Sequence, residues 1–212
     1  MPKIVDPQER RRAVADAVHA VVARHGLEAA TLRNVADEAG LAVGSVRHYF
    51  TDHDELMIFV VQELGRRVGE RVWAHAERLL SESGGSREDR RHRTEELLAE
   101  FLPLDDVRRD EVLLRHTFTM AARVRPPLLP HAEAIQQTLY DLVHRTLQGA
   151  QAAGGLPAEV NVEVESVRLR ALLDGLGLQA VMFPRRFPPD LLREVLHRHL
   201  DSLVAALDRD PG

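Results

Sequence analysis

Apolar residues recur three or four positions apart along almost the whole chain, and no segment shows the strict alternation of a β-strand. This spacing places the apolar side chains on one face of an α-helix. Prolines and glycines interrupt the pattern at Pro103 and in "RPPLLP", "GGLP" and "FPRRFPP". The sequence therefore predicts an all-α chain of about nine helices, in which three short helices precede a larger helical bundle.

Start and stop signals place the first four helices. The first lies in "DPQERRRAVADAVHAVVARHG" and ends at Gly26, and the second has Thr31 as its N-cap and Gly40 as its stop. The third runs from about residue 42 to 50, and Asp52 with Glu55 form an acidic capping box that opens a long fourth helix towards residue 80. We expect a loop at 81–93, further helices at about 94–102, 105–123, 127–153, 160–183 and 189–208, and two domains, residues 1–53 and 54–212.

Composition limits the classes of protein to which the chain can belong. Its 212 residues are 44% hydrophobic, which suffices for a sizeable core, and the absence of cysteine excludes disulfides and thiolate catalysis. No apolar run approaches the roughly 18 residues of a membrane span, and "MPKIVDPQERRR" lacks the apolar core of a signal peptide. We expect a cytoplasmic protein with no membrane partner. Because the net charge is -5, any contact with nucleic acid must come from a local basic surface.

The second and third expected helices, joined by a turn at Gly40, form a helix-turn-helix. The second helix of such a unit lies in the major groove of DNA, and the first crosses the phosphate backbone. Val46 and Phe50 form an inward i, i+4 pair, which leaves polar residues outside. The residues expected to face DNA are Thr31, Arg33, Asn34, Val43, Gly44, Ser45, Arg47, His48 and Tyr49.

Arg47 is the main candidate for reading a base, because its guanidinium can bind guanine in a bidentate contact or can bind a phosphate. The start of the second helix suits a phosphate through its free amides and partial positive charge. Arg10, Arg11 and Arg12 open the first helix. They could contact the DNA backbone or a minor groove, or form a plain solvated helix start.

"TLRNVADEAGLAVGSVRHYFTDHDEL" resembles the DNA-binding segment of the tetracycline-repressor (TetR) family of bacterial regulators, over residues 10 to 60. "LLDGLGLQAVMFP" at 172–184 resembles the penultimate helix of many members, especially the choline-responsive repressors of the betaine pathway. The resemblance implies a dimeric transcriptional regulator, a repressor that binds a palindromic double-stranded operator and is released by a small-molecule effector. It implies no catalytic residue and no cofactor.

Three residues depart from the family pattern. Ala42 stands where a capping serine is usual, which removes about 1 kcal/mol of helix stabilisation. Arg47 replaces a frequent tyrosine and adds charge at the groove. His53 replaces a lysine that meets a phosphate, so His53 joins the expected DNA-binding residues. Because only a protonated histidine would restore the charge, we expect DNA affinity to rise below neutral pH.

The last two expected helices have broad apolar stripes, whose area exceeds what one small bundle can bury. The resemblance implies that these two helices pair with their copies across a two-fold axis. Gly175 and Gly177 would permit close approach; alternatively, the stripes are only intrachain core. The expected dimer residues are Leu169, Leu172, Leu176, Val195, Leu196, Leu200 and Leu203. The resemblance places an effector cavity among the fourth to eighth helices. Its expected lining is Trp73, Phe101, His116, Phe118, Met120, Tyr140 and His144, with too few aromatic rings for a choline cage.

A second hypothesis, from another class, is a small all-helical enzyme or metal-binding protein that uses the 11 histidines. The "HRH" at 197–199 has the wrong helical spacing for a metal, although His116, His131 and His144 could meet in space. No HExxH motif, nucleophile elbow or glycine-rich phosphate loop is present. We therefore expect no metal site and no enzyme. The sequence does not distinguish a repressor from an activator or from a ligand-insensitive regulator.

Overall fold

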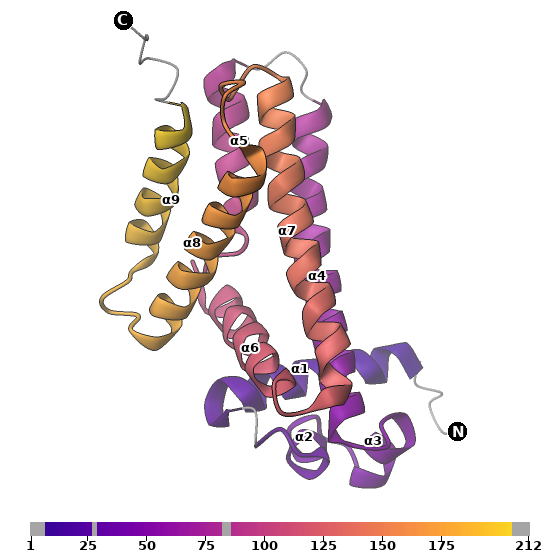
Figure 1. Cartoon of the computed structure of the whole chain (residues 1–212). Helices are drawn as coiled ribbons and strands as arrows, with labels where there is room; N and C mark the ends of the chain where they lie inside the picture. Colours follow the sequence, from indigo (N-terminus) through magenta and orange to yellow (C-terminus); the bar gives the residue numbers. More distant parts are fainter. Residues whose placement is uncertain (1–6, 27–28, 82–85, 205–212) are drawn as a thin grey trace, which may run out of the picture. The chain divides into compact units, whose positions relative to one another are not determined.

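The computed structural model describes residues 7–26, 29–81 and 86–204. Within these ranges the chain forms nine α-helices and no strand, which confirms the all-α prediction (Figure 1). The helices are α1 (Pro7–His25), α2 (Leu32–Glu38), α3 (Val43–Tyr49), α4 (His53–Ser81), α5 (Arg87–Ala99), α6 (Asp106–Ala122), α7 (Leu129–Ala152), α8 (Val162–Met182) and α9 (Pro189–Val204). A 3-10 turn at Pro126–Leu128 precedes α7. Residues 205–208 of the expected last helix lie outside the described ranges.

The contacts between helices divide the chain into two compact units. The smaller unit consists of residues 1–67 and 113–133, and the larger unit consists of residues 68–112 and 134–212. The helices α4, α6 and α7 therefore each contribute residues to both units. The division into folding domains at residue 53 stays a prediction.

In the smaller unit, α1, α2 and α3 enclose a core of small and branched apolar side chains. Val14, Val18, Val35 and Val46 are fully buried, and Phe50 is 2% exposed. The predicted i, i+4 pair on α3 is thus confirmed. Both predicted stops are confirmed as well, because the glycines after α1 and α2 have φ values of 82° and 65°, which favour glycine.

The capping residues of α2, α3 and α4 are those that the sequence predicts, except that one hydrogen bond of the capping box involves a neighbouring residue. Thr31 accepts a hydrogen bond from the Asn34 amide at 3.2 Å, whereas Ala42 makes no side-chain cap for α3. Asp52 accepts from the Glu55 amide at 2.8 Å, as a capping box requires. The return bond goes one residue further back, because the Glu55 carboxylate accepts from the amide and hydroxyl of Thr51, both at 2.7 Å. These bonds from Thr51 lower the pKa of Glu55.

The prediction of a loop through residue 93 is wrong, because α5 already begins at Arg87. Ser86 and Asp89 form a complete capping box at its start: the Ser86 hydroxyl accepts from the Asp89 amide at 3.0 Å, and the Asp89 carboxylate accepts from the Ser86 amide at 2.8 Å. The first two turns of α5 are polar and show no apolar period. Sequence periodicity does not reveal the ion pairs that α5 makes with a distant helix.

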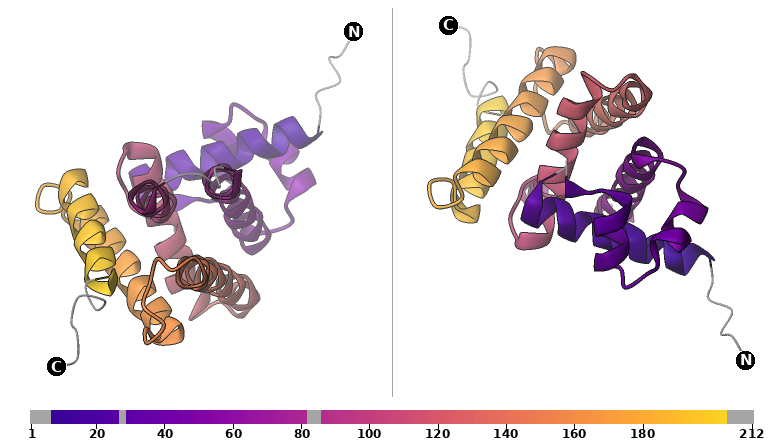
Figure 2. Two further views of the ribbon diagram at one scale, coloured as in Figure 1. Left: turned by 90° about the horizontal axis from the view of Figure 1, so that it is seen from above. Right: turned by 90° about the horizontal axis from the view of Figure 1, so that it is seen from below.

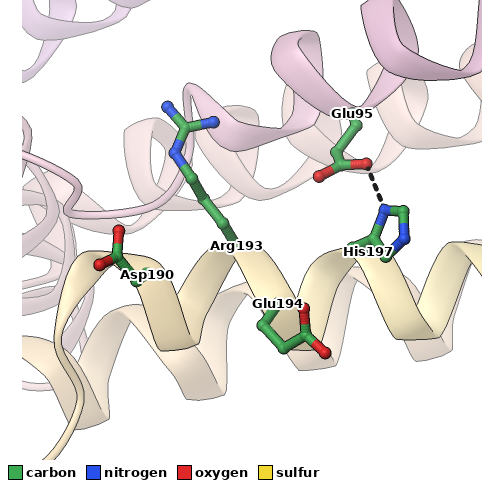
Figure 3. A pocket seen from close by; sticks show the side chains of 5 residues that line it. All are labelled: Glu95, Asp190, Arg193, Glu194 and His197. Carbon is green, nitrogen blue, oxygen red and sulfur yellow. Dashed lines mark hydrogen bonds and ion pairs between the residues drawn. The ribbon is translucent and has the colours of Figure 1, made fainter.

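That distant helix is α9. Arg193 pairs with Glu96 at 2.8 Å, and His197 contacts Glu95 through Nδ1 at 2.9 Å. Arg91 of α5 pairs with Asp201 further along α9. The side chains of α9 that face α5 leave an open, polar groove of about 340 Å³ between the two helices (Figure 3). These charged contacts fix α5 against α9.

The core of the larger unit is apolar and draws on five helices. Figures 1 and 2 show α9 running back alongside α8, and both helices turn leucines into this core. Its buried members include Leu97, Leu98, Phe101, Leu102, Val143, Leu147, Leu169, Leu173, Leu192, Leu196, Leu200 and Leu203. A charged cluster lies beside them: Arg71 of α4 binds Glu111 through both Nη atoms and Glu100 through Nε. The hydrogen bonds that Glu111 accepts from Arg71 raise the pKa of Arg71 above its usual value.

One side chain organises the connection between α7 and α8. The Gln151 amide nitrogen donates to the carbonyl oxygens of Pro157 at 2.8 Å and Val160 at 3.0 Å. Gly154 has φ +71°, and a Cβ on Gly155 would lie 2.9 Å from the Ala150 carbonyl oxygen. Both glycines are therefore required by the turn.

Candidate functional site

The site begins at the helix-turn-helix formed by α2, the turn at Gly40, and α3. Thr31, Arg33 and Asn34, expected to face phosphate, are all exposed at the start of α2. Besides its amide contact to Thr31, Asn34 donates its side-chain nitrogen to the Ala29 carbonyl at 2.8 Å. This bond fixes the approach to α2, and Arg33 beside it is exposed.

The outer face of α3 carries the expected DNA-reading residues. Arg47 and His48 are exposed, while Ser45 and Tyr49 are half-buried, as is Val43. Gly44 is exposed, and a Cβ built on it would meet no atom within 4 Å. The protein itself therefore leaves room at this position, and the close approach of DNA to Gly44 stays a prediction.

Arg11 of α1 is joined to this face through aromatic rings. Its guanidinium carbon lies 5.8 Å from the ring centroid of Tyr49 and 5.9 Å from that of Phe59 on α4. A cation over aromatic faces at such distances is attracted by the ring quadrupole. Sequence reasoning grouped Arg11 with its neighbours in an arginine run and missed this contact. Arg12 beside it is exposed, whereas Arg11 is half-buried.

His53, at the first position of α4, is engaged by another side chain of the smaller unit. Its Nδ1 lies 2.7 Å from Nη1 of Arg125, which also pairs with Asp54 at 3.1 Å. Because a guanidinium only donates, Nδ1 must accept, and the imidazole carries its proton on Nε2 in this contact. A doubly protonated His53 cannot keep it. The predicted phosphate contact of His53 therefore competes with Arg125, a residue that the sequence did not single out.

A chain of ion pairs joins α1 to α4 in the same unit. Glu63 accepts from Arg66 at 2.6 Å and from Arg67 at 3.2 Å, and Arg67 reaches Asp16 of α1 at 2.6 Å. The hydrogen bond from Arg66 is the largest cause that lowers the pKa of Glu63 to about 2. Glu63 is therefore a carboxylate at any physiological pH, and it holds both arginines in place.

The residues expected to line an effector cavity have different surroundings. Trp73 and Met120 are 63% and 62% exposed, and the Trp73 indole donates to Glu77 at 2.7 Å. These two side chains lie on the surface rather than in an enclosed cavity. Phe101 and Phe118 are buried core residues, and His116 is half-buried.

The remaining two of these residues, Tyr140 and His144 on α7, are brought together. Their rings stack with centroids 5.7 Å apart, and both side chains are half-buried. His144 also approaches the hydroxyl of Ser166 on α8 at 3.4 Å. They are the pair from the predicted lining that best fits a polar end of a binding site.

The seven expected dimer residues differ in burial. Four of them are buried in the core of their own chain: Leu169, Leu196, Leu200 and Leu203. Leu172, Leu176 and Val195 are partly buried, and Gly177 is buried. The sequence pattern showed apolar stripes but could not separate the face used inside the chain from a face left outside.

The described part of the chain offers neither a metal site nor a membrane span. Residues 7–26, 29–81 and 86–204 contain no group of three or more histidine or acidic side chains placed to hold a metal ion. The helices in those ranges include none with the length and apolar character needed to cross a membrane.

The fold places an exposed polar helix, α3, after a glycine turn and against a supporting helix, and this arrangement defines a helix-turn-helix DNA-binding protein. Residues 15–58 match the family described as bacterial regulatory proteins, tetR family. Residues 90–205 match the C-terminal domain of BetI-type transcriptional repressors. The chain belongs to the TetR family of bacterial transcriptional regulators. The family consists of regulators, which gives no support to the enzyme hypothesis.

Similar proteins extend over nearly the whole chain. The HTH-type transcriptional regulator PksA of Bacillus subtilis is 29% identical over 210 residues, 99% of this chain and 97% of its own. A transcriptional regulator from Rhodococcus sp. Rha1 has a similar structure, with a TM-score of 0.74, 28% identity and coverage of 92% and 96% of the two chains. A regulator from Saccharomonospora viridis, solved in complex with choline, shares the fold at 20% identity, with a TM-score of 0.72 and coverage of 92% and 96%.

Proposed function

We propose that the chain is a cytoplasmic repressor that binds a palindromic operator as a homodimer and is released by a small-molecule effector. The observation that carries the DNA part is the exposed polar face of α3, with Arg47 and His48 outward while Val46 and Phe50 are buried. The membership in the TetR family supports the rest. A two-fold dimer would present two copies of α3 to half-sites about 34 Å apart or a multiple of that distance.

The surface that we assign to the second copy is a stripe on α8, here called the α8 stripe. Its members are all exposed and follow one another by three or four residues: Val164, Val167, Ala171, Gly175, Leu178 and Met182. Small residues in the middle of such a stripe let two helices approach closely. Large exposed apolar side chains at both ends, such as Met182 at 60% exposure, are costly in a monomer.

Release by an effector would follow from a shift between two conformations. An effector changes DNA affinity only by as much as it binds one conformation better than the other. α4 contributes residues to both units, and only Phe50, Thr51 and Asp52 separate its start from α3. A conformational change in the larger unit can therefore be transmitted to the helix-turn-helix along the continuous helix α4.

The test is a titration of the purified protein with DNA from upstream of its own gene, at several salt concentrations. We expect saturable binding whose affinity falls steeply with salt, because phosphate contacts release counterions. Sedimentation should give a dimer, and Val167→Glu, in the α8 stripe, should give monomers that bind DNA poorly. A monomeric wild-type protein, or a protein that ignores all DNA and carries a bound metal by elemental analysis, would contradict the proposal.

A further inference from the structure

Arg170 is a buried cation in the middle of α8. The residue is 9% exposed, and it lies between Leu169 and Leu173, both in the apolar core of the larger unit. Its Nη2 pairs with Asp174 on the same helix at 2.7 Å and donates to the Gln136 side-chain oxygen on α7. Burial lowers the pKa of Arg170, although Asp174 opposes this. A charge in such a place is costly unless a partner compensates it.

The compensation that the chain provides is one-sided. Both contacts of Arg170 use the same nitrogen, Nη2, and no acceptor among the described residues bonds to Nε or Nη1. A guanidinium has five donors in a planar fork, and a single free donor can make a charge-assisted hydrogen bond to a carboxylate oxygen. The Nε and Nη1 positions of Arg170 thus have donors to spare within a largely buried side chain.

Other polar groups lie along the same two helices. On α7, Tyr140 follows Gln136 by one turn and His144 follows by another, which puts all three on one face. On α8, Ser166 lies one turn before Arg170 and contacts His144. The Tyr140 hydroxyl has no hydrogen-bond partner among the described residues. The two helices therefore share a polar strip whose donors exceed its acceptors, embedded among apolar side chains.

We propose that this strip, with Arg170 as its centre and Tyr140 and His144 beside it, binds the carboxylate of a small effector that has an apolar body. The inference rests on the proposed function and specifies the class of its effector. Arg170 would hold the carboxylate, the Tyr140 hydroxyl would donate to it, and the surrounding apolar side chains of α7 and α8, including Val143 and Leu173, would contact the rest of the molecule.

The charge of the site selects a singly charged anion. Arg170 contributes one positive charge, and Asp174 pairs with it through one nitrogen. A doubly charged phosphate would therefore leave more excess negative charge in a buried place than one carboxylate would. A quaternary ammonium ion such as choline would be repelled by the guanidinium, and the strip offers it a single phenol ring rather than a cage.

Calorimetric titration of the full-length protein with benzoate, hexanoate and decanoate, each beside its primary amide, tests the assignment. The amide keeps the shape and loses the charge. We expect at least one acid to bind the wild-type protein at least tenfold more tightly than its amide. Arg170→Gln should remove this preference, Arg170→Lys should retain part of it, and Arg145→Gln, an exposed arginine on α7, should leave it unchanged.

The comparison of acid with amide uses the wild-type protein, so it does not depend on the folding of a variant. Tyr140→Phe is a milder change, which should weaken the binding of the acid several-fold and leave the binding of the amide unaffected. Acids that bind no better than amides, or a folded Arg170→Gln protein that keeps the preference, would overturn the inference. DNA binding by the unliganded protein in the same preparations would show that the proposed function stands even then.

Discussion

The guanidinium of Arg11 lies over the ring of Tyr49, so the start of the first helix is tied to the end of the recognition helix. We expect Arg11→Gln to lower the free energy of unfolding by about 0.5–1 kcal/mol, the usual worth of such a contact near the surface. DNA affinity should fall several-fold while its slope against salt is kept, because Tyr49 loses its support and no phosphate contact is lost. Arg12→Gln, at the exposed neighbour, should leave the unfolding energy unchanged in urea titrations.

Arg47 is the residue whose removal should cost most in DNA binding. It is exposed on α3, so Arg47→Ala should weaken operator binding by about 1–3 kcal/mol if it reads a base. Circular dichroism should show unchanged helicity. Tyr49→Phe should give a smaller loss through its hydroxyl, which can donate to a phosphate. A loss of helicity in Arg47→Ala would assign the side chain a structural role instead.

The contact between His53 and Arg125 gives a prediction on pH. Protonation of both nitrogens of His53 breaks its acceptor contact with Arg125, so the expected rise of DNA affinity below neutral pH is opposed. Arg125→Gln should enlarge that rise, measured as the ratio of binding constants at pH 6 and pH 8. His53→Lys should abolish it. The hypothesis fails if His53→Lys shows the pH dependence of the wild-type protein.

The ion pairs of Glu63 lead to a prediction about the stability of the smaller unit at low pH. Its pKa is lowered to about 2 in the folded protein, against 4.5 without partners, so its contribution to stability is full above pH 4.5 and is lost as the pH falls towards 2. Glu63→Gln should cost roughly 1.5 kcal/mol at pH 7, the lower end for bonds to charged groups, because Arg66 is partly exposed. The difference should shrink at pH 3. The matched control is Glu194→Gln, which removes an exposed ion pair with Arg198 on α9.

The contacts of His197 lead us to expect the opposite pH dependence of stability in the larger unit. The hydrogen bond to Glu95 raises its pKa above 6.5, and Asp201 adds to this (Figure 3). A raised pKa gives stability that is present below pH 6.5 and lost as the pH rises through the folded value. His197→Gln should therefore lower Tm more at pH 6 than at pH 8.5, at equal protein concentration. Arg198→Gln, whose exposed guanidinium does not titrate in this range, should show no such difference.

The helix-turn-helix was predictable because its signals are local. Thr31 as cap, the glycines after α1 and α2, and the pair Val46 and Phe50 each act within one or two helical turns, and all are found as expected. The same locality explains the uncapped start of α3, which follows directly from Ala42. Signals of this kind can be read from one sequence without knowing which helix packs on which.

The larger unit was less predictable because its contacts join distant segments. Arg91, Glu95 and Glu96 of α5 pair with α9, about a hundred positions away, and only the capping pair at Ser86 could have revealed where α5 begins. Arg170 was likewise hidden in an apolar stripe that looked like ordinary core. Its significance follows from burial, which periodicity alone does not give.

The amide of Gln151 that bonds to the Pro157 and Val160 carbonyls has a consequence for assembly. These residues lead directly into α8, so the amide restrains the backbone at the start of that helix. Rotating a helix by one residue turns its side chains by about 100°. A change at Gln151 would therefore alter which side chains of α8 face outwards without replacing any of them.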